Sequence, residues 1–300
     1  MFRQTTILGP GLLGASLAMA IRKHALSERI VIWARNPESR KKCQNQQWCD
    51  ITFKSPEEAV IDSDLVLLCT PVHTITSLLK QIQPALAKNT LVSDVGSTKA
   101  FICHEAQQIF RDTPANFIGS HPMAGSEKTG MENAYPNLFE DAACILTPLQ
   151  DTPGPITQTL TKFWESLNMR VATVSPETHD TIVAHVSHLP HILASALCNC
   201  LSQKDNSWKT LAGGGLKDTT RIAAGDPELW KQILEQNRDE ILRAINGFEQ
   251  QLDLLKTALA ANDTNAVLAH LKQGKAYRDQ LAFNVQSSKP NVQSSNSFQE

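Results

Sequence analysis

The sequence predicts an α/β fold: a doubly wound sheet followed by an all-helical C-terminal domain. Short β-branched runs alternate with amphipathic stretches through the first half, which is typical of a mostly parallel sheet. After about Ser175 the strand pattern stops and long helical patterns follow. The length of 300 residues corresponds to about two domains. We expect a sheet domain at 1–173, a helical domain at 174–284 and a disordered tail at 285–300, where Ser, Asn and Gln leave little to bury.

The elements of the first half follow from the alternation. Strands are expected at Thr5–Leu8, Arg29–Trp33, Leu65–Cys69, Thr90–Asp94, Asn116–Ser120, Ala143–Thr147 and Arg170–Val174. Helices are expected at Leu12–Lys23, Ser55–Ile61, Thr74–Ala87, Thr98–Arg111 and Pro155–Leu167. Because the helices become sparse toward the end of this half, we expect mixed strand directions there.

The second half is predicted to be helical. A helical pattern at Pro176–Leu201 contains Pro190, which is expected to kink or break the helix. Gly213–Gly215 predicts a loop or sharp turn, and Asp226, followed by proline, predicts the start of another helix. From Trp230 to Leu255 apolar residues follow a 3.6-residue period. One small domain cannot bury so much apolar surface, so we expect this region to form a homodimer.

The overall composition argues against several classes of protein. Lys and Arg number 28 and Asp and Glu 30, a net charge of −2, which offers no basic field for a nucleic acid. No apolar run approaches the ~18 residues of a membrane-spanning helix, and the N-terminus lacks a signal-peptide pattern. The seven cysteines are scattered without a CxxC pair, as is typical of reduced thiols. We expect a cytoplasmic protein that binds neither nucleic acid nor membrane.

A glycine motif after the first expected strand predicts a Rossmann-type dinucleotide site. Gly9, Gly11 and Gly14 form GxGxxG between a strand and a helix, the context that gives this motif meaning. Gly9 permits a tight turn, Gly11 lets the backbone approach a pyrophosphate and Gly14 lets helix and strand pack closely. Leu12 and Leu13, in the first helical turn, belong to the same expected site. An ordinary βα turn is the less favoured interpretation.

The second expected strand ends at a position that selects between cofactors. An acidic residue about 20 residues after the last glycine binds the ribose 2′-hydroxyl of NAD. Here Ala34 occupies that position, and Arg35 and Asn36 follow. We therefore expect NADP to be favoured over NAD; the alternative is a solvated Arg35 on a loop. Thr70 and Pro71, directly after the third strand, are expected to contact the same cofactor.

Several later motifs narrow the class of protein. They are Asp94–Lys99 (DVGSTK), Gly119–Glu127 (GSHPMAGSE), Ser187–His191 (SHLPH), Gly213–Arg221 (GGGLKDTTR) and Asp226–Trp230 (DPELW). Together they resemble the prephenate/arogenate dehydrogenase family of tyrosine biosynthesis, over roughly Thr5 to Tyr277. The resemblance implies oxidative decarboxylation, in which hydride passes to a nicotinamide, the ring carboxylate leaves as carbon dioxide and the ring becomes aromatic. Prephenate and arogenate, which differ in a keto or amino group, both stay open as substrates.

The resemblance also assigns catalytic residues and a carboxylate-binding residue. His121 matches the group that accepts a hydrogen bond from the ring hydroxyl, a task for a neutral imidazole. Ser97 matches a residue near the hydroxyl and the nicotinamide, and it is also suited to cap the following helix. Arg221 matches the arginine that binds a substrate carboxylate, and Asp218, three residues earlier, is placed to orient it.

Further substrate-pocket residues follow from the resemblance. His191 and Ser126 are expected in the pocket, and Glu127 and Trp230 are expected to shape or gate it. A metal site is the alternative for the histidine cluster, which comprises His179, His185, His188 and His191. Because Pro190 disturbs the helical spacing and no fourth ligand fits, we expect no metal.

Two other functions stay open. A β-hydroxyacid-type dehydrogenase of similar architecture needs a catalytic lysine, for which Lys217 is the candidate. A non-catalytic dinucleotide sensor needs the glycines but not the pairing of His121 with Arg221, so that pairing argues against it.

Overall fold

The computed structural model describes residues 1–113, 115–125 and 128–281. Its eight-stranded sheet has the order β3-β2-β1-β4-β5-β6-β7-β8. The strands are β1 (Phe2–Leu8), β2 (Ser27–Trp33), β3 (Ile51–Phe53), β4 (Leu65–Leu68), β5 (Leu91–Asp94), β6 (Asn116–Pro122), β7 (Ala143–Thr147) and β8 (Arg170–Thr173). Neighbouring strands pair in parallel except β6 and β7, which are antiparallel. The doubly wound sheet and the mixed strand directions near its end are confirmed.

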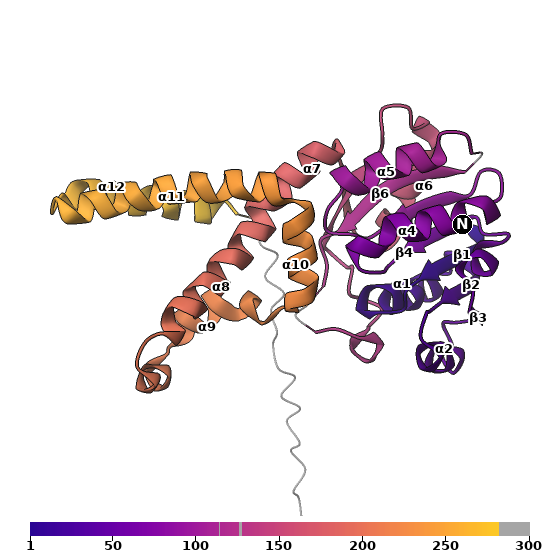
Figure 1. Ribbon diagram of the computed structural model, residues 1–300, viewed down its shortest axis with the longest axis horizontal. Helices are drawn as coiled ribbons and strands as arrows, with labels where there is room; N and C mark the ends of the chain where they lie inside the picture. The colour runs from indigo at the N-terminus through magenta and orange to yellow at the C-terminus, as the bar shows by residue number, and fades with distance from the viewer. Residues whose placement is uncertain (114, 126–127, 282–300) are drawn as a thin grey trace, which may run out of the picture. The chain divides into compact units, whose positions relative to one another are not determined.

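The helices of the sheet region cover both faces of the sheet (Figure 1). They are α1 (Leu12–Lys23), α2 (Pro37–Gln44), α3 (Pro56–Val60), α4 (Val72–Ile82), α5 (Ala100–Phe110) and α6 (Gly154–Glu165), with short 3-10 turns η1 (Gln83–Ala85) and η2 (Met131–Asn133). Alternate strand residues face opposite layers: Ile7 and Leu67 pack with α1 and α6, whereas Leu8 and Leu68 pack with α3, α4 and α5. This two-layer burial fixes the strand register.

Helix α2 and strand β3 were not predicted from the sequence, and both omissions have a physical reason. Helix α2 buries only Cys43 among its residues, so it lacks an apolar stripe; it begins because the Asn36 side chain accepts a hydrogen bond from the Glu38 backbone N–H. Strand β3 is only three residues long and partly exposed.

The second half is helical, as predicted. Its elements are α7 (Pro176–Val183), the π-helical turn η3 (Ala184–His188), α8 (Leu189–Ser202), the 3-10 turn η4 (Asn206–Leu211), α9 (Gly214–Thr220), the 3-10 turn η5 (Arg221–Ala224), α10 (Pro227–Gln236), α11 (Arg238–Ala260) and α12 (Thr264–Gln280). Figure 1 shows α7 and α10 beside the sheet region, while α8, with α9 along it, extends away from the sheet.

Three local expectations for this half are corrected. Pro190 does not break the helix, because it lies in the first turn of α8, where its missing N–H costs nothing, and the irregular π-helical turn precedes it. Gly213 is the N-cap of α9, so the glycine run begins a helix rather than forming a loop. The long apolar helix is interrupted at Asn237, which ends α10 before α11 begins; Asp226 caps α10 as expected.

One helical stretch in the described part of the chain, Pro176–Ser202, is long and apolar enough to cross a membrane by length and composition. It carries the buried polar side chains of His179, Asp180, His188 and His191. Such groups are costly in lipid, and here they face the interior of the protein.

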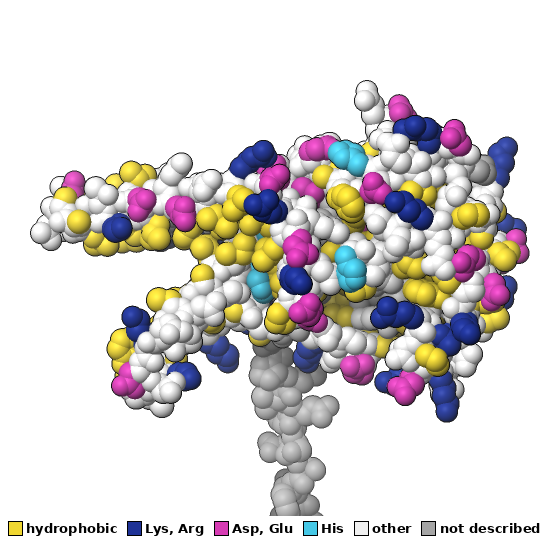
Figure 2. Space-filling model, in the orientation of Figure 1, with side chains coloured by type: hydrophobic (Ala, Val, Ile, Leu, Met, Phe, Trp, Pro, Cys, Tyr) yellow, Lys and Arg dark blue, Asp and Glu magenta, His cyan; other side chains and the backbone are white. Residues whose placement is uncertain are grey.

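The chain forms two compact units, Met1–Gly247 and Phe248 onward. Within the first unit, the helical part has a small core in which Ala184, Ile241 and Ala244 are buried. Large apolar side chains stay exposed on α11 and α12: Leu242, Phe248, Leu252, Leu254, Leu259, Leu268, Leu271 and Tyr277. Figure 2 shows hydrophobic side chains in a row along this pair of helices. Part of the predicted stripe is thus buried within the chain and part is left exposed.

Candidate active site

A cavity of about 890 Å³ lies at the carboxyl edge of the sheet, where the first unit's sheet and helices meet. The predicted site residues that line it are Gly11, Leu12, Leu13, Thr70, Pro71, Ser97, His121, His191, Arg221 and Trp230. Gly9, Gly14, Ala34, Arg35, Asn36 and Asp218 are not among the residues that line it. Ser126 and Glu127 lie outside the described residues. The fold thus brings together the glycine turn, the histidine and the arginine from distant parts of the sequence.

The turn between β1 and α1 has the shape that a dinucleotide requires. Gly9 has φ +102°, and a Cβ atom there would lie 2.8 Å from Cγ2 of Thr70. A Cβ on Gly14 would lie 2.1 Å from the Gly9 carbonyl oxygen, whereas at Gly11 it would meet only open space. Gly11 is also the N-cap of α1, with no side-chain cap. The first backbone N–H groups of α1 are therefore available to an anion such as a pyrophosphate.

The residues expected to select the cofactor follow the end of β2. Ala34 is buried and Arg35 is exposed, while Asn36 uses its side-chain oxygen to cap α2. Sequence reasoning missed Arg40, whose Nη1 donates hydrogen bonds to the carbonyl oxygens of Ala34 (2.6 Å) and Arg35 (3.0 Å). Arg40 holds the turn that carries Arg35 and places a second guanidinium beside it.

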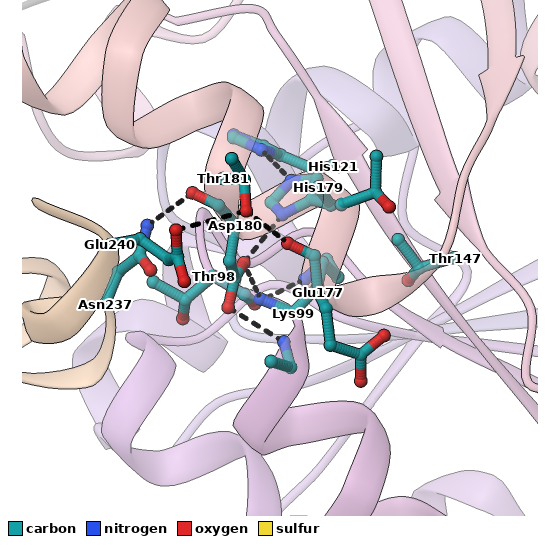
Figure 3. Close-up of polar contacts among 12 residues, drawn as sticks. Thr98, Lys99, His121, Thr147, Glu177, His179, Asp180, Thr181, Asn237 and Glu240 are labelled. Atoms are coloured by element: carbon teal, nitrogen blue, oxygen red, sulfur yellow. Dashed lines mark hydrogen bonds and ion pairs between the residues drawn. The ribbon is translucent and has the colours of Figure 1, made fainter. Parts of the chain in front are cut away.

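His121 lies at the end of β6 and is 7% exposed. Its Nδ1 lies 2.8 Å from Nε2 of His179 on α7 (Figure 3). The other ring nitrogen, Nε2, has no hydrogen-bond partner among the described residues and is the one left for a ligand in the cavity. Burial, followed by the nearby His179 and Lys99, holds the pKa of His121 well below its usual value. The imidazole is therefore neutral at physiological pH.

The neighbour of His179 organises the start of α5. The Asp180 carboxylate lies 2.7 Å from Nδ1 of His179 and accepts hydrogen bonds from the backbone N–H groups of Lys99 (2.7 Å) and Ala100 (2.9 Å). Lys99, not Ser97, is the N-cap residue of α5, and Asp180 supplies the capping carboxylate from another element. The capping role considered for Ser97 is therefore corrected, which leaves its side chain to the cavity.

A buried ion pair supports the loop that carries Ser97. Nζ of Lys99 lies 2.6 Å from Oδ2 of Asp94, and both side chains are fully buried. The same carboxylate oxygen accepts a hydrogen bond from the Gly96 backbone N–H at 2.8 Å. Sequence reasoning missed this pair, although both residues belong to the DVGSTK motif; their spacing on a loop carries no periodic signal.

The helical side of the cavity is built around a stacked pair. The rings of His191 and Trp230 lie 3.5 Å apart, centroid to centroid, at an interplanar angle of 10°. Gly225 allows this packing, because a Cβ there would lie 2.6 Å from Nε1 of Trp230. Burial lowers the pKa of His191. Arg221, an exposed residue in η5, lines the same side of the cavity.

Asn237, at the break between α10 and α11, connects the helical elements. Its Nδ2 donates to the Asp180 carbonyl oxygen at 2.8 Å and lies 3.1 Å from Nδ1 of His188. Burial lowers the pKa of His188 to about 4. A residue that ends the long helix thus orients two groups at the site, which explains why a side chain with poor helix propensity is buried here.

The histidines of α7 and η3 form no metal cluster in the part of the chain that the structure describes. His179 is engaged by His121 and Asp180, His188 lies against Asn237, and His185 is exposed with Nδ1 against the Thr181 carbonyl oxygen.

The fold and the cavity together define a class of protein. The order β3-β2-β1-β4-β5-β6 places a topological switch between β1 and β4, and the glycine turn lies there. The cavity extends from this turn to a buried, neutral histidine. These are features of a Rossmann-type dehydrogenase that uses a nicotinamide dinucleotide.

The chain belongs to the prephenate dehydrogenase family. Residues 17–173 match the prephenate dehydrogenase nucleotide-binding domain, and residues 175–273 match the prephenate dehydrogenase dimerization domain. The chain is 31% identical over 283 residues to a cyclohexadienyl dehydrogenase of Zymomonas mobilis. The aligned region covers 93% of this chain and 96% of that protein.

Solved structures agree with this assignment. A prephenate dehydrogenase from Aquifex aeolicus, in complex with hydroxyphenyl propionate and NAD+, is 32% identical with a TM-score of 0.87 and covers 94% of this chain and 99% of its own. The Synechocystis arogenate dehydrogenase is 30% identical with a TM-score of 0.80, covering 92% and 99%. The family resemblance predicted from the motifs is confirmed.

Proposed function

We propose that the protein catalyses the NAD(P)-dependent oxidative decarboxylation of prephenate or arogenate in tyrosine biosynthesis, with NADP favoured. The observation that carries this proposal is the neutral His121, which lines one cavity together with the glycine turn and Arg221. The rival β-hydroxyacid chemistry needs a catalytic lysine on the helical domain, and the candidate there, Lys217, is an exposed residue of α9 that is not among those that line the cavity.

His121 accepts the proton of the ring hydroxyl as the reaction proceeds. The C–H bond at the hydroxyl-bearing carbon breaks and its electron pair leaves as hydride; the nicotinamide supplies the acceptor for it. The O–H proton moves toward Nε2 of His121, and the ring carboxylate departs as carbon dioxide, leaving its electron pair to the aromatic ring. The resulting phenolate takes the proton back. Ser97 hydrogen-bonds near the same hydroxyl, and the two residues hold the ring for transfer.

Arg221 binds a carboxylate of the substrate from the opposite side of the cavity. Its planar guanidinium suits bidentate recognition of a carboxylate. His191 and Trp230 form the apolar wall against which the ring lies. We assign Ser126 and Glu127 to the same pocket, and Asp218 to the orientation of Arg221, on the family resemblance alone.

The preference for NADP rests on charge at the end of β2. Ala34 has no carboxylate that could accept a hydrogen bond from the ribose hydroxyl or repel a phosphate. Arg35 is exposed and cationic. Arg40, which hydrogen-bonds both carbonyl groups of this turn, adds a second positive charge. Two guanidinium groups favour a 2′-phosphate.

We further infer a cytoplasmic homodimer that binds neither nucleic acid nor membrane, with a dinucleotide-binding domain at 1–173 and a helical substrate and dimerisation domain at 174–284. The polar tail expected at 285–300 lies outside the described residues. Exposed apolar residues on α11 and α12, and the match to a dimerization domain, support the homodimer.

A steady-state assay that crosses prephenate and arogenate with NAD and NADP tests the proposal. Reduced cofactor and carbon dioxide should form in equal amounts with at least one pair. A protein that binds cofactor but shows no turnover with any of the four pairs is a sensor, and the proposal is then wrong.

A further inference from the structure

A chain of three side chains runs from the cavity into the helical part of the first unit. His121 lies 2.8 Å from His179, and His179 lies 2.7 Å from the Asp180 carboxylate (Figure 3). All three residues are buried, with His179 fully so. The contact between His121 of β6 and His179 of α7 joins residues 58 apart in the sequence.

The donors and acceptors along this chain have a single consistent direction. A carboxylate only accepts hydrogen bonds, so the hydrogen between Asp180 and His179 belongs to Nδ1 of His179. Burial lowers the pKa of His179, so its ring is neutral and carries one hydrogen; its Nε2 must therefore accept. Nδ1 of His121 is then the donor in the 2.8 Å contact, and Nε2 of His121 holds the free lone pair.

The Asp180 end of the chain is fixed in place. Oδ1 and Oδ2 accept the backbone N–H groups of Lys99 and Ala100 at the start of α5. A helix N-terminus favours a negative charge. Asn237 also donates to the carbonyl oxygen of Asp180. The carboxylate therefore cannot rotate away from His179 without breaking the cap of α5.

We infer that His179 and Asp180 are positioning residues, which fix His121 in the tautomer that carries its hydrogen on Nδ1 and presents Nε2 to the substrate hydroxyl. The kinetic consequence rests on the proposed function of His121, whereas the tautomer itself does not. In the opposite tautomer Nε2 carries a hydrogen and cannot accept the hydroxyl proton. The pair also places a carboxylate behind the positive charge that forms on His121 in the transition state.

The charged and titratable groups around His121 agree with this role. They are His179 from α7, His188 from η3 and Lys99 ahead of α5. The positive charge of Lys99 is balanced by Asp94 at 2.6 Å. Asp180 is held by neutral backbone N–H groups, so its negative charge is left for the histidine pair.

Selective ¹⁵N labelling of histidine side chains and NMR measure the tautomer directly. In the wild-type protein the signals that disappear in His121→Asn should show a protonated Nδ1 and an unprotonated Nε2. His179→Gln places an amide oxygen where Nε2 of His179 lies and should keep this tautomer, whereas His179→Leu should lose it. His185→Asn serves as the control, because His185 is an exposed histidine in η3, the helical turn that follows α7. A protonated Nε2 in the wild-type protein overturns the inference.

Kinetics test the consequence. Removal of the acceptor in His179→Leu should lower kcat on the order of 10- to 100-fold while KM for substrate and cofactor changes little. His179→Gln should recover a large part of kcat, and His185→Asn should match the wild type. Thermal unfolding identifies any variant that fails to fold. If His179→Leu does not fold, His179→Gln alone tests the inference: a full loss of kcat with wild-type KM and the wild-type tautomer contradicts a positioning role. An inactive wild-type protein with the predicted tautomer refutes the proposed function but not the inference that His179 and Asp180 fix the tautomer of His121.

Discussion

The two sides of the cavity differ in how they are held. On the sheet side, His121 and the Lys99–Asp94 pair are buried and fixed by contacts of 2.6 to 2.8 Å within the chain. On the helical side, Arg221 is exposed, and the local core is a small cluster around Ala184, Ile241 and Ala244. The groups proposed for proton transfer are thus preorganised in one protomer, while substrate recognition lies in a region whose apolar surface is still exposed.

This difference predicts that the two sides control different kinetic constants. A preorganised acceptor acts on the transition state and therefore on kcat, whereas an exposed side chain that binds a substrate carboxylate acts on binding. Variants on each side therefore separate the two roles.

The largest effect is expected from His121→Asn. Loss of the acceptor should lower kcat by ~10²-fold or more, with KM for the substrate much less changed. His185→Asn, which alters an exposed histidine, should leave kcat unchanged. Near-normal turnover in His121→Asn, measured under saturating substrate, would remove His121 from the mechanism and with it the distinction between the two sides.

Arg221→Ala should act mainly on KM. A substrate carboxylate left without its partner loses about 2–5 kcal/mol of binding, by analogy with truncated charge pairs. Arg221→Lys should lose less, because it keeps the charge but not the bidentate fork. Lys217→Ala, on the preceding helix and away from the cavity lining, is the control. If cofactor affinity measured by fluorescence titration falls as much as substrate affinity, Arg221 is structural.

Cofactor choice is a smaller effect and belongs to the sheet side. A partly exposed phosphate contact contributes roughly 1.5–3 kcal/mol, or about 10- to 150-fold in kcat/KM for NADP over NAD. Ala34→Asp with Arg35→Ala should reverse the preference by repelling the phosphate and accepting from the ribose. Lys41→Ala, exposed on α2, is the control. A wild-type kcat/KM for NAD equal to that for NADP contradicts the Arg35 argument.

The local signals in the sequence were enough to predict most of the sheet and the glycine turn. A turn that needs Gly9 at positive φ, or a buried β-branched strand, leaves a mark within a few residues. The hydrogen-bonded contact of His121 with His179 and Asp180 joins segments distant in sequence, so no short stretch of sequence predicts it. The same holds for Asn237, whose buried contacts with Asp180 override the helical period that predicted one continuous helix.

The exposed apolar row on α11 predicts the oligomeric state. Phe248→Glu with Leu252→Glu places two charges one helical turn apart on that row, where the side chains are 38% and 53% exposed. Light scattering should show a dimer for the wild type at micromolar concentration and a monomer for the variant, because buried charges oppose association. Gln251→Glu, on the same helix, should stay dimeric. A stable wild-type monomer would contradict the interface.

The smallest effect is expected from pH near neutrality, and its sign follows from burial. The pKa of His121 lies well below the usual 6.5, so the neutral, active form persists above that value and kcat should be flat from pH 6.5 upward. Activity should fall only as pH drops toward the lowered pKa. Folding changes in the same direction: the unfolded chain binds protons below 6.5 that buried His121, His179 and His188 resist, so stability present above 6.5 is lost on acidification. The thermal unfolding midpoint, measured at each pH, separates a loss of activity from a loss of folded protein. An acid limb of kcat centred at 6.5 or above, in protein that is still folded, would show that His121 is not the desolvated acceptor that the sheet side of the cavity holds.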